Sequence, residues 1–253
     1  MIVLVKRKNA VLILLILFLS VAIFSIDGGA NSITETSKSN GGAVVVLDAG
    51  HGGEDPGVVS DYSGLAEKDL NLRIAQLVKV MLEQDGYTVI MTRIEDVLQY
   101  KEGTKEITDK RRQDLTKRKK VIDESDADIA VSIHMNGFKD TKYKGAQTFF
   151  PPSSVDSERL AKSIQNEMVK NLDPDNKRVA LIKKDRIVIF RDLKIPTALI
   201  ECGFLSNSDE EAKLKTLDYQ EQVAKAIKLG IDGFFGKEQR SNQSITSDSS
   251  NKK

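Results

Sequence analysis

The sequence predicts a single α/β domain, in which a mostly parallel β-sheet is covered by helices on both faces. Between residues 43 and 236, short apolar runs of strand length alternate with longer segments of helical periodicity. Such alternation is typical of parallel sheets whose crossover connections are helices. Hydrophobic residues make up 40% of the 253-residue chain, which is enough for one packed core, and we find no internal repeat.

The first half of this domain is predicted to contain three strands, at residues 43–47, 87–92 and 129–133. A helix lies between the first two strands, because apolar residues share one helical face from Leu70 to Met81 and Gly86 then ends the pattern. The first strand, this helix and the second strand form the first β-α-β unit.

Residues 94–117 are highly charged and only weakly periodic, so we expect a solvated surface excursion that leads into a helix around residues 118–123. A regulatory lid and an interaction surface remain as alternatives. The basic run 117–120 is expected to be a solvated helix face, although contact with an anionic polymer is also open.

The second half continues the alternation with strands at residues 146–150, 186–190 and 197–200 and a helix at residues 157–172. Two helices close the domain. The first of them is expected to start with a capping box at residues 208–211.

The two ends of the chain differ in composition from the domain. Residues 1–26 place a Lys-Arg-Lys cluster before an uncharged apolar stretch, which predicts a signal peptide or a membrane anchor with the domain outside the cytoplasm. Residues 27–42 are small and polar and predict a flexible linker. The serine-rich residues 237–253 predict a disordered tail.

Composition also excludes several classes of function. The 38 basic and 37 acidic residues nearly balance, and tryptophan is absent, so nucleic acid is not an expected partner. Cys202 is the single cysteine, which excludes an internal disulfide and a cysteine-rich zinc knuckle. Any metal must therefore be held by histidines and carboxylates.

The chain has only two histidines, and both follow predicted strands. His51 comes after the first strand and His134 after the third, where open α/β sheets gather their ligands. A catalytic zinc ion commonly binds two histidines and one carboxylate. Glu54, Asp55 and Glu67 are the candidate carboxylates; Glu67 lies in the first turn of the predicted helix, and spacing alone leaves open whether it is a ligand or only a helix-start residue.

Glu201 ends the apolar strand at residues 197–200, where an ionisable side chain is costly unless it is paired. It is a candidate general base beside a metal, and the alternative is a structural ion pair with Arg93 or Arg191. Its neighbour Cys202 lacks a third histidine to activate it, so we interpret Cys202 as a buried, inert residue.

The chain from about residue 44 to residue 235 resembles the zinc-dependent N-acetylmuramoyl-L-alanine amidases of bacterial cell walls. Five ordered motifs support the resemblance, at residues 47–57, 67–72, 89–93, 132–136 and 196–207. The resemblance implies that His51, Glu67 and His134 bind Zn²⁺ and that Glu201 is the catalytic carboxylate. It also implies a twisted sheet flanked by helices, with peptidoglycan as the substrate. Asn136 and Arg191 are expected either to contact the substrate or to be structural.

A short domain behind an apolar segment resembles the spore-cortex amidases, which prepare muramic acid for δ-lactam formation before germination. That resemblance implies export to the cell wall or the forespore intermembrane space, with a protein activator possible. One rival is a carboxypeptidase-like wall peptidase with His51, Glu54 and His134 as ligands. The other is a wall-binding scaffold without activity.

Overall fold

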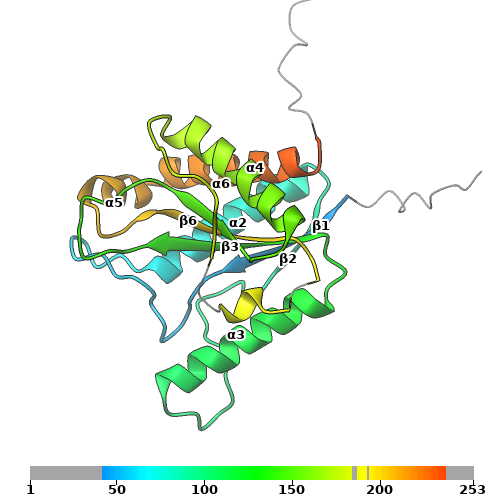
Figure 1. Cartoon of the computed structure of the whole chain (residues 1–253). Coiled ribbons are helices and arrows are strands. Elements are labelled where there is room, and N and C mark those ends of the chain that lie inside the picture. Colours follow the sequence, from blue (N-terminus) through cyan, green and yellow to red (C-terminus); the bar gives the residue numbers. More distant parts are fainter. Residues whose placement is uncertain (1–41, 184–186, 193, 238–253) are drawn as a thin grey trace, which may run out of the picture. The chain divides into compact units, whose positions relative to one another are not determined.

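The computed structural model describes residues 42–183, 187–192 and 194–237, and a six-stranded sheet organises them (Figure 1). The strand order is β2-β1-β3-β6-β4-β5. The strands are β1 (Val44–Ala49), β2 (Thr88–Met91), β3 (Ile129–Asn136), β4 (Gln147–Phe150), β5 (Leu181–Ile182) and β6 (Thr197–Phe204).

Four of the five neighbouring strand pairs run parallel, and only β4 and β6 pair antiparallel. The prediction of a mostly parallel sheet is therefore confirmed. β1, β3 and β6 lie side by side at its centre and are buried along most of their length. Continuous burial explains why these strands are mostly apolar, because both faces of a central parallel strand are covered.

Helices cover both faces of the sheet, as the sequence predicts. On one face pack α2 (Glu67–Gln84), α4 (Val155–Leu172) and α6 (Leu217–Phe234); on the other lies α3 (Ile107–Glu124) (Figure 1). Alternate residues of β1 divide between the two cores: Val45 and Leu47 pack in the core of the first face, and Val46 packs with Ile122 of α3 in the second. The period of two along β1 thus separates the two layers.

Helix α3 corrects two expectations. It includes residues 107–117, which were expected to form a surface excursion, and Arg118 of the basic run is 2% exposed rather than solvated. The buried residues of α3 are Asp114, Arg118 and Ile122, so the inner face of the helix is mainly charged. Apolar periodicity could not reveal such a helix, because Asp114 and Arg118 on its buried face are charged and only Ile122 of the three packs in a hydrophobic core.

Residues 188–190, which were expected to be part of a strand, form a 3₁₀ helix instead (η1, Val188–Phe190). Ile189 and Phe190 pack in the same core as Ile122, so the apolar run reflects burial rather than strand pairing. Residue 186 of that expected strand lies outside the described residues. The short strand β5 was not predicted, because both of its residues are exposed and give no pattern.

The last two helices, α5 (Ser208–Leu214) and α6, confirm the prediction of two closing helices. The N-cap of α5 differs from the expected capping box. Asn207 is the capping residue, and its Oδ1 accepts from the backbone N–H groups of Asp209 and Glu210, each at 3.1 Å. Glu210 accepts instead from the backbone N–H groups of Gly145 and Phe204.

The predicted export segment (residues 1–26) lies outside the described residues, as do the predicted linker except Gly42 and the predicted tail except Lys237. Within the described part of the chain, no helix is both long enough and apolar enough to cross a membrane.

Candidate functional site

The candidate residues lie at the carboxyl ends of the three central strands. His51 follows β1, His134 lies near the end of β3, and Glu201 is the register partner of His134 on β6. Glu67 is the first residue of α2. Because these strands are parallel neighbours, their ends meet at one edge of the sheet, where ligands bind in α/β folds.

His51, Glu67 and His134 each offer one ligand atom, and the three atoms lie within 4.8 Å of one another. Glu67 Oε1 lies 3.2 Å from His51 Nε2 and 2.9 Å from His134 Nδ1. The two imidazole rings stand edge to face, with centroids 5.1 Å apart. Among the described residues, this is the group of histidines and acids with the geometry to hold a metal ion.

Backbone amides fix the carboxylate of Glu67, which is 2% exposed. The N–H of Met135 donates to Oε1 at 3.0 Å and the N–H of Val58 donates to Oε2 at 2.8 Å. Burial alone would raise the pKa of Glu67, but the hydrogen bonds and charges of His134 and His51 outweigh it and hold this pKa well below its usual range. Glu67 is therefore ionised and oriented towards both histidines.

Two glycines make the close approach of these side chains possible. A Cβ at Gly50 would lie 2.2 Å from the ring of His134. A Cβ at Gly57, where φ is +68°, would lie 2.4 Å from Glu67 Oε2. Any larger residue at either position would displace a member of the group.

Asp55 orients His51. Its Oδ2 lies 2.8 Å from His51 Nδ1, so the ring turns Nε2 towards Glu67 and His134. Metal ligands are commonly held in this way by a carboxylate on the other ring nitrogen. Burial lowers the pKa of His51, but the hydrogen bonds to Asp55 and Glu67 prevail and raise it to about 9. Sequence reasoning considered Asp55 only as a possible ligand; its spacing of four residues from His51 was the available signal.

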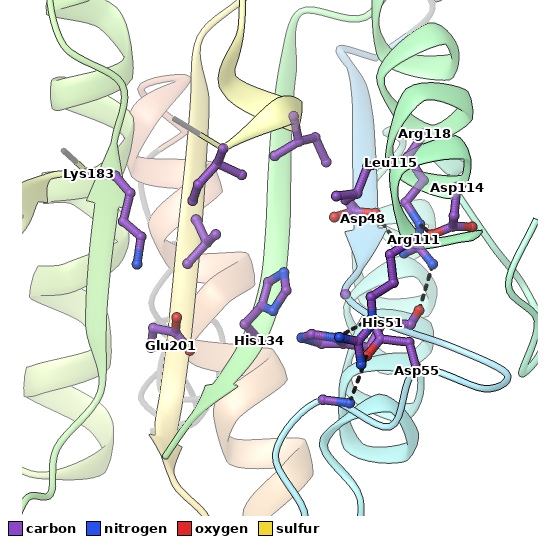
Figure 2. Close-up of a pocket in the computed structure, with 15 residues that line it drawn as sticks. Asp48, His51, Asp55, Arg111, Asp114, Leu115, Arg118, His134, Lys183 and Glu201 are labelled. Carbon is purple, nitrogen blue, oxygen red and sulfur yellow. Dashed lines mark hydrogen bonds and ion pairs between the residues drawn. The ribbon is translucent and has the colours of Figure 1, made fainter. Parts of the chain in front are cut away.

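Two buried arginines bind the backbone between β1 and His51 (Figure 2 shows Arg118). Arg93 donates to the carbonyl oxygens of Ala49 at 2.8 Å and Gly50 at 3.0 Å. Arg118 donates to the carbonyl oxygens of Ala49 and His51, the latter at 2.6 Å. Three successive carbonyls are thus held by guanidinium groups, which fixes His51 at its positive φ of 62°.

Asp48 and Asp114 balance the buried charge of Arg118. Asp114 Oδ2 accepts from Arg118 Nε at 2.6 Å, and Asp48 Oδ1 accepts from Nη1 at 3.1 Å. Burial raises the pKa of Asp48, but Arg118 and the hydroxyls of Ser132 and Thr92 outweigh it, so the pKa is lowered. Sequence reasoning missed this network, because an arginine in a basic run gives no sign of burial.

We expect Arg118→Met to destabilise the domain by about 3–5 kcal/mol, since it leaves two buried carboxylates without their partner. Urea unfolding at neutral pH measures this loss. The contribution of ionised Asp48 is full above its ordinary pKa and disappears as pH falls through the lowered, folded-state value. The difference between wild type and variant should therefore shrink in acid, where the orphaned carboxylate of Asp48 takes up a proton. An equal difference at both pH values would contradict this explanation.

Glu201 faces the same cavity as His51 and His134 (Figure 2). Its Oε2 is buried, and no described residue forms a hydrogen bond with it. Burial raises the pKa of Glu201 to about 7. The expected alternative, an ion pair with Arg93 or Arg191, is not formed within the described part of the chain; Arg93 bonds to backbone carbonyls instead. Glu201 thus places a carboxyl oxygen, Oε2, that has no hydrogen-bond partner among the described residues, in the same cavity as His51 and His134.

The other candidate residues lie outside the group. Glu54 is exposed and bonds to Tyr100 and Lys110, so the ligand set of the carboxypeptidase alternative does not come together. Asn136 Oδ1 accepts from the neighbouring N–H of Gly137. Cys202 is 1% exposed, and burial raises the pKa of its thiol, as an inert cysteine requires.

Comparison with known proteins agrees with this geometry. Residues 45–233 match the family model described as N-acetylmuramoyl-L-alanine amidase. The chain belongs to this amidase family. The matched range includes all of β1, α2, β3 and β6 except Val44, and so contains His51, Glu67, His134 and Glu201.

Two relatives and one further structure place the amidase within the family. It is 39% identical over 194 residues to the germination-specific N-acetylmuramoyl-L-alanine amidase of Bacillus subtilis strain 168, a match that covers 77% of this chain and 80% of that protein. The CwlD amidase of Clostridioides difficile, solved in complex with the GerS lipoprotein, has a TM-score of 0.75 and 42% identity and covers 78% of this chain and 100% of its own. An N-acetylmuramoyl-L-alanine amidase of Clostridium difficile 630 gives a TM-score of 0.66 at 30% identity, covering 78% and 99%.

Proposed function

We propose that this amidase is a zinc hydrolase of peptidoglycan, in which His51, Glu67 and His134 hold the metal and Glu201 is the catalytic carboxylate. The scissile bond is the amide between N-acetylmuramic acid and the first L-alanine of the stem peptide. The observation that carries the proposal is the position of Glu201: its buried Oε2 has no hydrogen-bond partner among the described residues, and it lines the same cavity as His51 and His134 of the His51, Glu67 and His134 group.

The donor set fits zinc. Two imidazole nitrogens and one carboxylate oxygen are the ligands of many catalytic zinc sites, which leave a position open for water or substrate. Glu67 is ionised, and the hydrogen bond between Asp55 and His51 Nδ1 leaves Nε2 of that ring facing Glu67. Arg93 and Arg118 fix the backbone behind His51, so the site needs little rearrangement to accept an ion.

Zn²⁺ bound there would supply Lewis-acid chemistry, polarising the scissile carbonyl and making water more acidic. Glu201 takes the proton from the attacking water as the new C–O bond forms. It then passes this proton to the nitrogen of L-alanine as the C–N bond breaks. In the structure, burial raises the pKa of Glu201 to about 7. A nearby cation would lower this pKa, so that at neutral pH more of Glu201 would be in the ionised form that a base requires.

We propose a role in the spore cortex, where cleavage exposes muramic acid for δ-lactam formation before germination. The B. subtilis relative, which carries "germination-specific" in its name, supports this role. Action on peptidoglycan requires export, for which residues 1–26 are the expected signal or anchor. The structure of the C. difficile relative with a lipoprotein supports the expectation of a protein activator.

A digest of purified cortex peptidoglycan, analysed by mass spectrometry, tests the function. Protein from residue 27 onward, supplied with Zn²⁺, should release stem peptides that begin with free L-alanine and leave glycan without peptide. An inactive wall-binding scaffold would leave the muramoyl-peptide links intact. A carboxypeptidase would shorten the stem peptides from their carboxyl ends and leave those links in place.

A further inference from the structure

A cavity of about 450 Å³, lined by His51, His134 and Glu201, lies between the sheet and α3. One wall is apolar and consists of Leu115, Ile187, Ile189 and Leu199. Figure 2 shows two cationic side chains on opposite sides of this cavity: Arg111, which extends from α3, and Lys183, which follows β5. His51, His134 and Glu201 lie between them. A substrate that reaches Glu201 therefore passes a positive charge.

Arg111 differs from the other arginine of α3 that lines the cavity. The donors of Arg118 are taken up by buried protein acceptors, and its side chain is 2% exposed. Arg111 is 44% exposed and, among the described residues, bonds only to Asp55, with Nη2 at 2.5 Å from Oδ1. A guanidinium group has five N–H donors, so most of those of Arg111 remain available at the cavity.

The position of Arg111 relative to the proposed metal group is fixed by two linked contacts. Asp55 Oδ1 binds Arg111, and Asp55 Oδ2 binds His51 Nδ1 at 2.8 Å. Arg111 and His51 are separated only by the carboxylate of Asp55, which contacts both. An extended peptide advances about 3.5 Å per residue. Arg111 therefore lies within reach of the second stem-peptide residue, which follows the alanine of the cleaved amide.

We propose that Arg111 binds the free carboxylate of the second stem-peptide residue and so selects substrates that carry this charge. The inference rests on the proposed function, because it places the scissile amide at Glu201. The planar fork of arginine matches a carboxylate and can accept it while one nitrogen stays on Asp55. Lys183 is less suited, since its Nζ lies 4.7 Å from the centre of the Phe149 ring and over its face.

Arg111→Met tests the proposal with two synthetic disaccharide-dipeptides that differ only at the second residue, a free carboxylate in one and a carboxamide in the other. Charge-assisted hydrogen bonds at a partly exposed site predict a fall of about tenfold in kcat/KM for the carboxylate substrate, mainly through KM. The kcat/KM for the carboxamide substrate should change by less than about twofold. The zinc content per protein, measured by inductively coupled plasma mass spectrometry, should stay at the wild-type level.

Arg112→Met is the matched control. Arg112 is the next residue of α3, is 73% exposed and pairs with Asp109 rather than with a residue of the cavity. Arg112→Met should leave kcat/KM for both substrates at the wild-type value.

The proposal would be overturned if Arg111→Met lowered kcat/KM equally for both substrates and also lowered the zinc content. Arg111 would then act on His51 through Asp55. No change on either substrate would overturn it as well. If the zinc-loaded wild type cleaves neither dipeptide nor whole peptidoglycan, the proposed function itself fails and takes this inference with it.

Discussion

Glu201→Gln is expected to lower the rate of peptidoglycan cleavage by about 10²–10⁴-fold while the protein keeps its zinc. Glutamine has nearly the same shape as glutamate but cannot take a proton from water at neutral pH. Glu201 contributes no atom to the His51, Glu67 and His134 group, so its replacement leaves the three ligands in place. The measurements are turnover on peptidoglycan and bound zinc per protein.

Folding should also survive this change. Glu201 Oε2 is buried and has no hydrogen-bond partner among the described residues, so the neutral amide removes the cost of a buried charge. The unfolding midpoint in urea should therefore equal or exceed that of the wild type at neutral pH. Retention of near wild-type turnover, or loss of zinc together with turnover, would contradict the role given to Glu201.

Glu67→Ala is expected to weaken zinc binding by more than about 100-fold, because loss of a ligand costs more than loss of a group that only orients one. The change also separates His51 from His134, since Glu67 Oε1 contacts both. Turnover should fall with the metal. Competition with a coloured chelator gives the affinity, and circular dichroism checks that α2 is still formed.

Glu54→Ala is the matched control for Glu67. Glu54 is a carboxylate close to His51 in sequence, but it is exposed and bonds to Tyr100 and Lys110. Its replacement should leave zinc affinity unchanged within about twofold. The opposite result, tight binding in Glu67→Ala and weak binding in Glu54→Ala, would assign the third ligand to Glu54 as a carboxypeptidase-like site requires.

Strands β1, β2, β3, β4 and β6 and the positions of both histidines were predictable, because apolar runs mark buried strands and α/β sheets gather functional side chains at strand ends. The choice of Glu67 over Glu54 and Asp55 was not predictable from spacing alone. It depends on how α2 packs on the sheet, which brings Glu67 Oε1 within 2.9 Å of His134 Nδ1. The motif resemblance implies Glu67, and the structure brings this residue together with His51 and His134.

The charged residues around the histidines, such as Arg118 and Arg111, were not predictable, since they stand in stretches whose sequence pattern indicates exposure to solvent. Arg118 lies in a basic run, yet it is buried and binds the carbonyl oxygen of His51. Arg111 is one of two adjacent arginines, and only the three-dimensional position of α3 shows which of them faces the cavity. The signal of apolar periodicity fails for a helix such as α3, whose buried face is mainly charged.

The most direct test of the zinc site is anomalous X-ray scattering at the zinc edge from crystals grown with Zn²⁺. We predict one strong peak at ligand distances of about 2.0–2.2 Å from His51, Glu67 and His134, with Glu201 nearby but not bound to the ion. A peak elsewhere, or no peak at these three side chains in the presence of ample zinc, would contradict the proposed catalytic centre.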